Sequence, residues 1–405
     1  MKNKLSVALS VLVCAVLIFA ALGIGAVKGW KQERAEVVTA LNQGGELYSL
    51  RQTRAMDALN LCALAQRHQL SDDADIQALR NGARVLTGKS DLQAILAADN
   101  DISATAARLE AKFKGLDDRE KNYLSALVDA LSPANGLNSR YTAISEDFND
   151  RFASSLMGKL AAMLGVDPVS DAPAGTCDAA KIAPRYPKQD GYATDAARIL
   201  SGTTLEDLGT VDKRLDKADV LRLKIATVDF LDGQDAEAYA DALFQRWDLD
   251  DEDVLLLLAV GSGECAISAG SDAARKLTPA IQEELLQQHV KPVLDKTDYE
   301  DAVVDFTLAF VSEVNRLYGK RISTAGLFGK SASGMFDGID QLDFGLADDD
   351  GGSFFTREDK GTGFSFLKVV LIVAVLLIVF GSRSSKARDR AAGIADKVKS
   401  SIHKR

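Results

Sequence analysis

The sequence predicts a membrane-anchored protein of the α + α/β class: an N-terminal helical bundle, then an α/β sandwich with a mixed sheet, and a transmembrane helix at each end. Three observations predict it. Apolar runs at residues 5–27 and 364–380 are close to the ~20 residues that cross a bilayer as a helix. Residues 33–165 carry apolar side chains at helical spacing. Residues 254–260, after Asp253, form a short continuous apolar run bounded by acidic and turn residues, which is typical of a strand buried on both faces, with one turn of a buried helix as the alternative.

Composition limits the classes of function. The 405-residue chain has a formal net charge of −10 and no cluster of Lys and Arg between Trp30 and Gly363. Because nucleic-acid binding depends largely on such clusters, we expect no nucleic-acid partner. The cysteines are isolated, which argues against a zinc site or a disulfide framework, and the histidines are dispersed, which argues against a catalytic histidine. These residues are Cys14, Cys62, Cys177, Cys265, His68, His289 and His403.

Residues 5–27 contain no charge and follow Lys2 and Lys4. They are either a signal peptide or an uncleaved membrane anchor. The apolar core of a signal peptide has about 7–15 residues, so the length of this run favours the anchor.

Residues 364–380 are the second predicted transmembrane helix. The tail after it, residues 381–405, has a large excess of Lys and Arg, which the positive-inside rule assigns to the cytoplasm. Two crossings of the cell membrane then place both termini in the cytoplasm and the acidic middle of the chain outside it, although Lys28, Lys31 and Arg34 oppose this orientation. The bilayer is therefore an expected partner. The tail is either a topology determinant or an amphipathic helix on anionic lipid.

Residues 33–165 are expected to form the helical bundle. In its last long helix, apolar residues recur at spacings of three and four from Leu137 to Leu164, and an earlier helix shows the same pattern from Ile102 to Phe113. Stripes at this spacing are typical of core packing.

The stretch from Arg140 to Phe152, RYTAISEDFNDRF in one-letter code, resembles the RYN…(D/Y)N…F pattern that closes the helical domain of LemA proteins. The resemblance covers roughly the first 165 residues, and LemA proteins also begin with one membrane helix. Their early basic-Pro-Asn signature is absent, because residues 66–69 read Gln-Arg-His-Gln. The family has no established enzyme chemistry, so the resemblance implies a membrane-tethered bundle.

Two segments have linker composition. Residues 166–190 hold Pro168, Pro173, Pro184 and Pro187 and are expected to be extended and semi-stiff. Residues 319–362 are rich in Gly, Ser and Asp and predict a flexible tether. Their Asp-Asp-Asp-Gly-Gly run lacks the spacing and the closing Glu of an EF-hand, which favours a solvated linker over a calcium loop.

Between these linkers, residues 191–318 change period and predict a mixed sheet with helices on its faces. A tight Gly-Ser-Gly turn is expected to make the strand after it antiparallel to the buried strand. The expected order β-α-β-β-α-α occupies residues 221–229, 236–247, 254–260, 264–270, 275–290 and 299–318.

Several stretches of this module resemble the TPM domain, in the same order along the chain. They are Thr194-Asp-Ala-Ala197, Tyr239-Ala-Asp-Ala-Leu-Phe-Gln-Arg-Trp247, Asp253-Val-Leu-Leu-Leu257, Ile267-Ser-Ala-Gly270 and Asp298-Tyr-Glu-Asp-Ala-Val303. The resemblance implies a TPM-like fold. Some TPM proteins are reported as acid phosphatases that depend on a divalent ion held by carboxylates at the edge of the sheet, so it also implies Ca²⁺ or Mg²⁺ as a possible cofactor.

The implied metal ligands here are Asp195, which matches the acidic residue at the entry of the family's domain, and Asp272, in the loop after Gly270. Other positions depart from the family: Ala274 and Pro279 stand where relatives are acidic. An acidic run at residues 248–253 precedes the buried strand and either joins such a site or is a solvated turn.

The sequence supports two classes of function. The first is a non-catalytic extracytoplasmic scaffold or binding protein, acting with unidentified envelope proteins in envelope maintenance or membrane-protein quality control. The alternative is a divalent-metal-dependent phosphatase of the TPM type. No P-loop, GxSxG or HExxH motif indicates another enzyme class.

Overall fold

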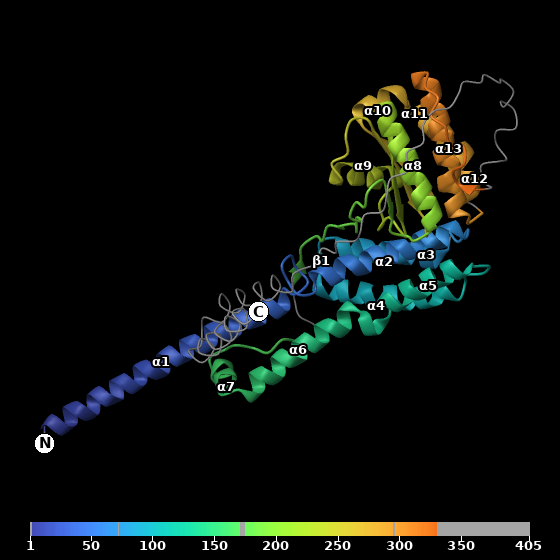
Figure 1. The fold of residues 1–405 in the computed structure, drawn as a ribbon. Helices are drawn as coiled ribbons and strands as arrows, with labels where there is room; N and C mark the ends of the chain where they lie inside the picture. Colours follow the sequence, from blue (N-terminus) through green and yellow to red (C-terminus); the bar gives the residue numbers. More distant parts are fainter. Residues whose placement is uncertain (1, 72, 171–174, 295, 330–405) are drawn as a thin grey trace, which may run out of the picture. The chain divides into compact units, whose positions relative to one another are not determined.

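The structure is a computed structural model that describes residues 2–71, 73–170, 175–294 and 296–329 (Figure 1). The predicted transmembrane helix at 364–380, the basic tail at 381–405 and most of the linker at 319–362 lie outside these residues.

The N-terminal apolar run forms part of one long helix, α1 (Lys2–Val38) (Figure 1). Within it, Val11–Val38 is long and apolar enough to cross a membrane, with a mean hydropathy of 2.5 and only 11% of its most apolar window buried. Among the described residues α1 is the one helix that meets this criterion. It fits a membrane anchor or a signal sequence, and it fixes no orientation.

A helical region follows, as predicted. Each of α3, α4 and α5 begins at an aspartate whose carboxylate accepts hydrogen bonds from the first turn of the helix. The apolar faces of these helices meet in one core, which buries Ile102 and Leu109 as expected. The elements are α2 (Tyr48–Arg67), α3 (Ala74–Thr87), α4 (Leu92–Glu110), α5 (Asp118–Ala130), a 3₁₀ turn (Pro133–Asn135), α6 (Leu137–Ser154) and α7 (Leu156–Met163).

The predicted stripe from Leu137 to Leu164 is only partly correct. The first part, α6, buries Leu137, Phe148 and Phe152, but Leu164 is 52% exposed. The helix breaks because Ser155 adopts an extended conformation and its hydroxyl accepts a hydrogen bond from the backbone N–H of Gly158 at 2.9 Å. The residues after the break therefore face another direction.

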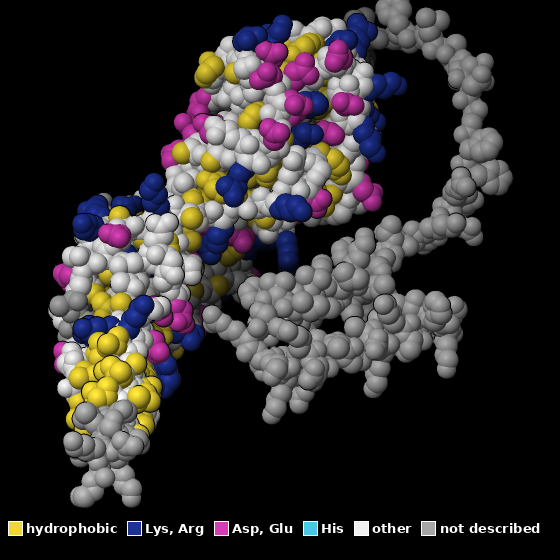
Figure 2. Space-filling model, turned by 90° about the vertical axis from the view of Figure 1, so that its left-hand side faces the viewer, with side chains coloured by type: hydrophobic (Ala, Val, Ile, Leu, Met, Phe, Trp, Pro, Cys, Tyr) yellow, Lys and Arg dark blue, Asp and Glu magenta, His cyan; other side chains and the backbone are white. Residues whose placement is uncertain are grey.

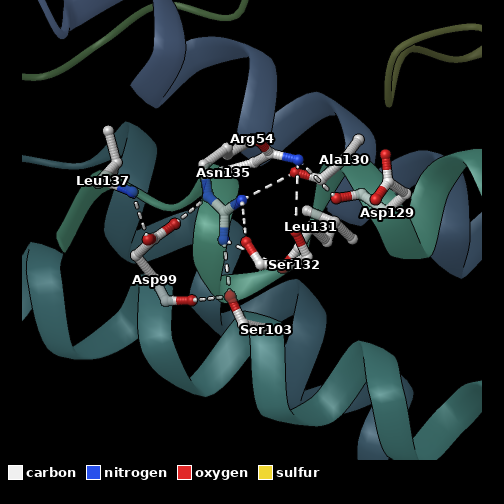
Figure 3. A network of polar contacts seen from close by, with 9 residues as sticks. All are labelled: Arg54, Asp99, Ser103, Asp129, Ala130, Leu131, Ser132, Asn135 and Leu137. Atoms are coloured by element: carbon white, nitrogen blue, oxygen red, sulfur yellow. Dashed lines mark hydrogen bonds and ion pairs between the residues drawn. The ribbon is translucent and has the colours of Figure 1, made fainter. Parts of the chain in front are cut away.

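A buried ion pair, Arg54–Asp99, joins four segments of the helical region (Figure 3). Arg54 on α2 donates to Asp99 and to Ser103 on α4, and also to the carbonyl of Ala130 at 2.9 Å. The other oxygen of Asp99 accepts the backbone N–H of Leu137 at 2.7 Å. The pair thus supplies partners for backbone groups at the end of α5 and the start of α6 that would otherwise be buried without one.

The proline-rich linker lies against the helical region along its described part instead of hanging free. Strand β2 (Thr176–Cys177) pairs with β1 (Ser90–Asp91). Arg51, which is fully buried, donates to the carbonyl of Asp178 at 2.8 Å and to that of Gly88 at 2.6 Å. Composition predicted the extended backbone of this segment but not its hydrogen bonds.

The second module contains a four-stranded sheet in the order β3-β4-β5-β6. The first three strands are parallel and β6 is antiparallel to β5, as the Gly-Ser-Gly turn predicted. The short first strand was not anticipated. The strands are β3 (Ala193–Asp195), β4 (Arg222–Val228), β5 (Asp253–Ala259) and β6 (Glu264–Ala269).

Helices cover both faces of this sheet (Figure 1). Successive residues of β5 point into two different cores: Leu256 packs with α8 and α13, and Leu257 packs with α9. All residues of β5 are buried, so the predicted two-sided burial is confirmed. The helices are α8 (Gly202–Ala218), α9 (Ala236–Arg246), α10 (Ser271–Lys276), α11 (Pro279–Leu285), a π-helical turn (Leu286–Val290), α12 (Lys291–Leu294) and α13 (Tyr299–Tyr318).

The start of the predicted tether is packed onto this module. The backbone N–H of Phe328 donates to Asp207 at 2.6 Å, and the ring of Phe328 is buried. Asn315 exchanges hydrogen bonds with the backbone of Ile322. The composition rich in Gly, Ser and Asp therefore placed the start of the flexible segment too early, because Leu327 and Phe328 are buried in the core of this module.

Candidate functional site

The parallel strands β3, β4 and β5 end at the same edge of the sheet, which we call the carboxyl edge. Their register places Asp195 beside Thr227 on β4, and Thr227 beside Leu258 on β5. In open α/β sheets this is the edge at which ligands generally bind. Asp195, the carboxylate predicted to bind an ion, therefore lies at an edge where a ligand could bind.

Asp195 lies at this edge, but its carboxylate is engaged by the protein itself. One oxygen accepts the backbone N–H of Ile199 at 3.0 Å and the hydroxyl of Thr227, and the other accepts the backbone N–H of Leu200 at 2.9 Å. These bonds hold the turn after β3, in which Arg198 has a positive φ of 55°. The arrangement gives Asp195 a structural role in shaping the loop.

Asp232, which follows β4, is the most heavily engaged carboxylate at the carboxyl edge. It is 2% exposed and accepts hydrogen bonds from Asn60 on α2 at 3.0 Å and from the backbone N–H of Arg185 at 2.7 Å. The Arg185 guanidinium also donates to the Asp232 carboxylate, with its Nε 3.0 Å from Oδ2. Arg185 also reaches Asp57 on α2 at 3.2 Å. The linker, the helical region and the sheet thus meet at one cluster of charges.

Burial and pairing with Arg185 have opposite effects on the pKa values of the aspartates in this cluster. Burial alone would raise the pKa of Asp232, but the hydrogen bonds from Arg185 and Asn60 outweigh it and hold the pKa below its usual value. At Asp57 burial dominates over the attraction of Arg185, so the pKa of that carboxyl is raised. The hydrogen bonds to Asp232 raise the pKa of Arg185. Arg185 and Asp232 are therefore both charged at neutral pH and form an ion pair.

A second set of contacts joins α5 to the same edge. The hydroxyl of Tyr123 donates to Asp229 at 2.6 Å, and Arg119 donates to the carbonyls of Ala197 at 2.7 Å and Arg198 at 3.2 Å. Burial, followed by the hydrogen bond to Asp229, raises the pKa of Tyr123, so the phenol keeps its proton and remains a donor. This edge of the sheet is thus capped by helices from the other half of the chain.

Beside these contacts lies a groove of about 530 Å³. Its walls are largely apolar or aromatic, and its polar groups are three aspartates, one asparagine and one arginine. The lining residues are Asp57, Asn60, Tyr123, Ala126, Leu127, Ala130, Arg185, Tyr186, Pro187, Ala196, Val228, Asp229, Phe230 and Asp232. A concave surface with apolar walls and a few charged groups is the usual form of a binding site.

Asp272 is at the opposite edge of the sheet. The chain reverses direction in β6, and Ala269 at its end pairs with Val254 at the start of β5. Asp272 follows in α10, half exposed and paired with Arg275 at 2.8 Å. The structure therefore does not bring Asp272 and Asp195 together, and the expectation that they share one ion site is wrong, because β6 returns antiparallel.

The acidic run before β5 lies near Asp272 but is also engaged. Ser271 donates to Asp251 at 2.9 Å, and Arg222 pairs with Asp250 at 2.6 Å and with Asp253 at 2.9 Å. Among the described residues, no group of three or more His, Cys, Asp or Glu side chains has an arrangement that could hold a metal ion.

A family model of the TPM domain matches residues 193–313. Residues 193–313 form a TPM domain. The match begins at the first residue of β3 and ends within α13, so it contains the whole sheet and the residues Asp195, Asp229 and Asp232. The predicted resemblance is confirmed for this part of the chain.

Two further comparisons add little to the TPM assignment. The solution NMR structure of the N-terminal domain of a protein from P. gingivalis is 15% identical, over 31% of this chain and 82% of that chain, with a TM-score of 0.30. No curated protein matches the chain significantly. The family assignment therefore covers the TPM domain alone.

Sequence reasoning found Asp195 but missed the residues that define the site. Tyr123, Asp57 and Asn60 come from helices whose contact with the TPM domain leaves no periodic or spacing signal in the sequence. Arg185 lay inside a segment interpreted as a linker. Asp232 carried one local signal, the Asp-Gly pair that it forms with Gly233, which marks a turn directly after β4.

Proposed function

We propose that the chain is a membrane-tethered binding protein of the TPM type, without catalysis, acting outside the cytoplasm in envelope maintenance or membrane-protein quality control. The observation that carries this proposal is the engagement of the carboxylates at the carboxyl edge. Asp195, Asp229 and Asp232 all accept hydrogen bonds from the protein's own donors. Calcium requires six to eight oxygen ligands, and at Asp195 and Asp232 both carboxylate oxygens already accept bonds that hold the fold and would have to be given up or weakened.

In this proposal the groove beside the carboxyl edge receives a segment of a partner protein. Three carboxylates and one guanidinium line it, which leaves it acidic, and Tyr123, Tyr186 and Phe230 provide aromatic faces. Aromatic faces with nearby carboxylates suit a side chain that has an apolar stem and a cationic head. The expected occupant is therefore a segment that presents Lys or Arg.

The tether in this proposal is α1 as an uncleaved anchor, together with the predicted helix at 364–380 and cytoplasmic termini. We also propose that the helical region is LemA-like. Supporting this, the residues that carry the resemblance have packing roles: Phe148 and Phe152 are buried, and Asn149 exchanges two hydrogen bonds with the backbone of Val169.

Site-specific photo-crosslinking tests the groove. A benzophenone amino acid replaces Ala126, which lines the groove, in the full chain within native membranes, and the matched control carries it at Ala104, exposed on α4. We expect a discrete adduct from position 126 only, weakened by high salt because the groove is acidic. Identical adducts from both positions, or none from 126, would contradict the proposal.

The alternative function, a divalent-metal-dependent phosphatase, is favoured by the TPM domain itself and by the presence of Asp195. It requires the carboxylate of Asp195 to exchange its backbone donors for an ion. Phosphate-ester hydrolysis by the full chain that depends on Ca²⁺ or Mg²⁺ and disappears in Asp195→Asn would establish this alternative.

A further inference from the structure

In the described part of the chain, the exposed large apolar side chains gather on two elements. Among the described side chains, the strongly exposed large hydrophobic residues belong to α1 or to α7 and its last flanking residue. Leu156 is 77% exposed, Met163 is 85% exposed and Leu164 is 52% exposed. In Figure 2, hydrophobic side chains cover the lower part of the described molecule, at the height of α1 and α7 in Figure 1. A patch of this kind marks an interaction surface.

The packing of α7 differs from that expected in water, because most of its large apolar side chains are exposed. A helix at the surface of a soluble protein turns its large apolar residues toward the core. In α7 the small residues Gly158 and Ala161 are buried and Leu160 is partly buried. Leu156 and Met163 face outward, and with them the exposed Lys159, whose long side chain can extend to the headgroups. Helices in a bilayer pack through small residues and present large ones to the acyl chains. The orientation of α7 is therefore that of a lipid-facing helix.

This orientation is fixed by the local backbone. A Cβ placed on Gly158 would lie 1.9 Å from the carbonyl oxygen of Phe152, so the turn between α6 and α7 closes only with glycine there. The Ser155 hydroxyl caps the new helix. The outward face of α7 thus follows from the turn.

The exposed face of α7 continues the apolar surface of α1. On α1 the small residues Gly23 and Ala26 are buried, and a Cβ on Gly23 would lie 3.2 Å from the Leu164 side chain. Ala26 and Ala161 belong to the same apolar cluster. The small residues of α1 thus make room for Ala161 and for the Leu164 side chain, and the outward-facing large side chains of the two elements lie next to each other.

The position of this contact along α1 sets its depth. Gly23 lies four residues before Val27, the end of the apolar run, which is about 6 Å at 1.5 Å per residue. Trp30 follows with Lys28 and Lys31 on either side, and aromatic and basic residues of this kind occupy the membrane interface. Leu164 is therefore level with acyl chains just beneath the headgroups.

We propose that α7 is a second membrane contact, embedded among the lipid acyl chains of the leaflet from which α1 emerges. The occupant of its exposed face is lipid. Two contacts on one rigid region restrict how that region tilts on the membrane, and thereby set which face of the helical region lies toward lipid. The inference rests on α1 being an anchor and does not depend on the proposed groove or its partner.

Spin-label accessibility tests this in the full chain, reconstituted in nanodiscs of phosphatidylcholine and phosphatidylglycerol. The background carries Cys14→Ala and Cys265→Ser, since the other two cysteines are buried. Nitroxides are attached to cysteine in place of Met163, of Leu17 on α1, or of Ala104 on the water-exposed face of α4. Relaxation by oxygen, which partitions into acyl chains, is compared with relaxation by a water-soluble nickel complex.

We expect the Met163 and Leu17 labels to be relaxed several-fold more by oxygen than by nickel, and the Ala104 label to show the opposite preference. If the Leu17 label reports acyl chains while the Met163 label behaves like Ala104, α7 lies in water and the inference is wrong although the anchor stands. If neither label reports acyl chains, the anchor and the inference fail together.

Discussion

Arg54 contributes to the fold through charge and backbone contacts at once. It is 1% exposed and joins α2, α4, α5 and the start of α6 through Asp99 and backbone carbonyls (Figure 3). Removing one member of a buried ion pair leaves the other charge without compensation. We expect Arg54→Met to lower the free energy of unfolding by about 3–5 kcal/mol, measured by urea denaturation of the detergent-solubilised chain.

The control is Arg84→Met, because Arg84 is exposed on α3. It should change stability by less than about 0.5 kcal/mol. Combining Arg54→Met with Asp99→Leu should recover only part of the loss, because the uncompensated charge is then absent but the backbone groups of Ala130 and Leu137 remain without these partners. Equal effects at Arg54 and Arg84 would show that the buried pair is not what holds these segments.

The shifted pKa values of Asp232 and Asp57 predict how the contact between the helical region and the TPM domain responds to pH. The pKa of Asp232 is lowered, so its contribution is present at neutral pH and is lost as the pH falls below about 4, through the folded-state value. The pKa of Asp57 is raised, so it takes up a proton before an unfolded aspartate does, and this stabilises the folded state as the pH falls toward 4.

Melting temperatures between pH 3 and pH 8 measure both effects. We expect stability to rise slightly from pH 7 toward pH 5 and to drop below about pH 4. Asp57→Asn should reduce the rise, to which Glu264 and Asp305 with their raised pKa values also contribute, and Asp232→Asn should reduce the drop while lowering stability at neutral pH. A drop below pH 4 that is unchanged in Asp232→Asn would assign it to other carboxylates.

At the scale of elements, the turn between α6 and α7 depends on one glycine. A methyl group at Gly158 would collide with the backbone of Phe152, whereas one at Gly25 on α1 would meet nothing within 4 Å. We expect Gly158→Ala to destabilise the chain by about 1–3 kcal/mol. Gly25→Ala should be neutral or slightly stabilising, because alanine favours helix. Thermal unfolding in detergent measures the difference, and similar values for the two variants would contradict the packing described for α7.

Elements were predictable from the sequence where one local pattern determines burial. The continuous apolar run of β5 indicated burial on both faces, and the Gly-Ser-Gly turn indicated an antiparallel β6. The break at Ser155 was not predictable from the spacing of apolar residues, because the stripe continues across it. Asp195 was identified through its family resemblance. The antiparallel direction of β6 puts Asp272 at the other edge of the sheet, and the prediction of a shared ion site did not take that direction into account.

At the scale of the whole described chain, Arg67 is the clearest link between the helical region and the TPM domain. From α2 it donates to the carbonyl of Val260 at 2.6 Å, pairs with Glu120 at 3.6 Å, and lies 5.5 Å from the centre of the Tyr299 ring. We expect Arg67→Ala to increase amide hydrogen exchange in the loop after β5 by at least tenfold, because about 1.4 kcal/mol of lost contact has that effect. Exchange at the far edge, near Asp272, should not change.

The contact between the two halves was the least predictable feature. It is made by single side chains such as Arg67, Tyr123 and Arg185, each from a different segment, and no periodic pattern encodes such pairings. The linker composition at 166–190 indicated separated modules, whereas its hydrogen bonds join them. For this reason the groove, which both halves line, could not be inferred from the sequence.

The most direct measurement of the central claim is a calorimetric titration of Ca²⁺ and Mg²⁺ into the full chain in nanodiscs, with a phosphate-ester assay on the same sample. If the carboxylates at the carboxyl edge are structural, neither ion binds saturably at millimolar concentration, no ester is hydrolysed, and Asp195→Asn only lowers the melting temperature. Saturable binding with turnover, both abolished in Asp195→Asn, would contradict the account and make the TPM domain an ion-dependent phosphatase.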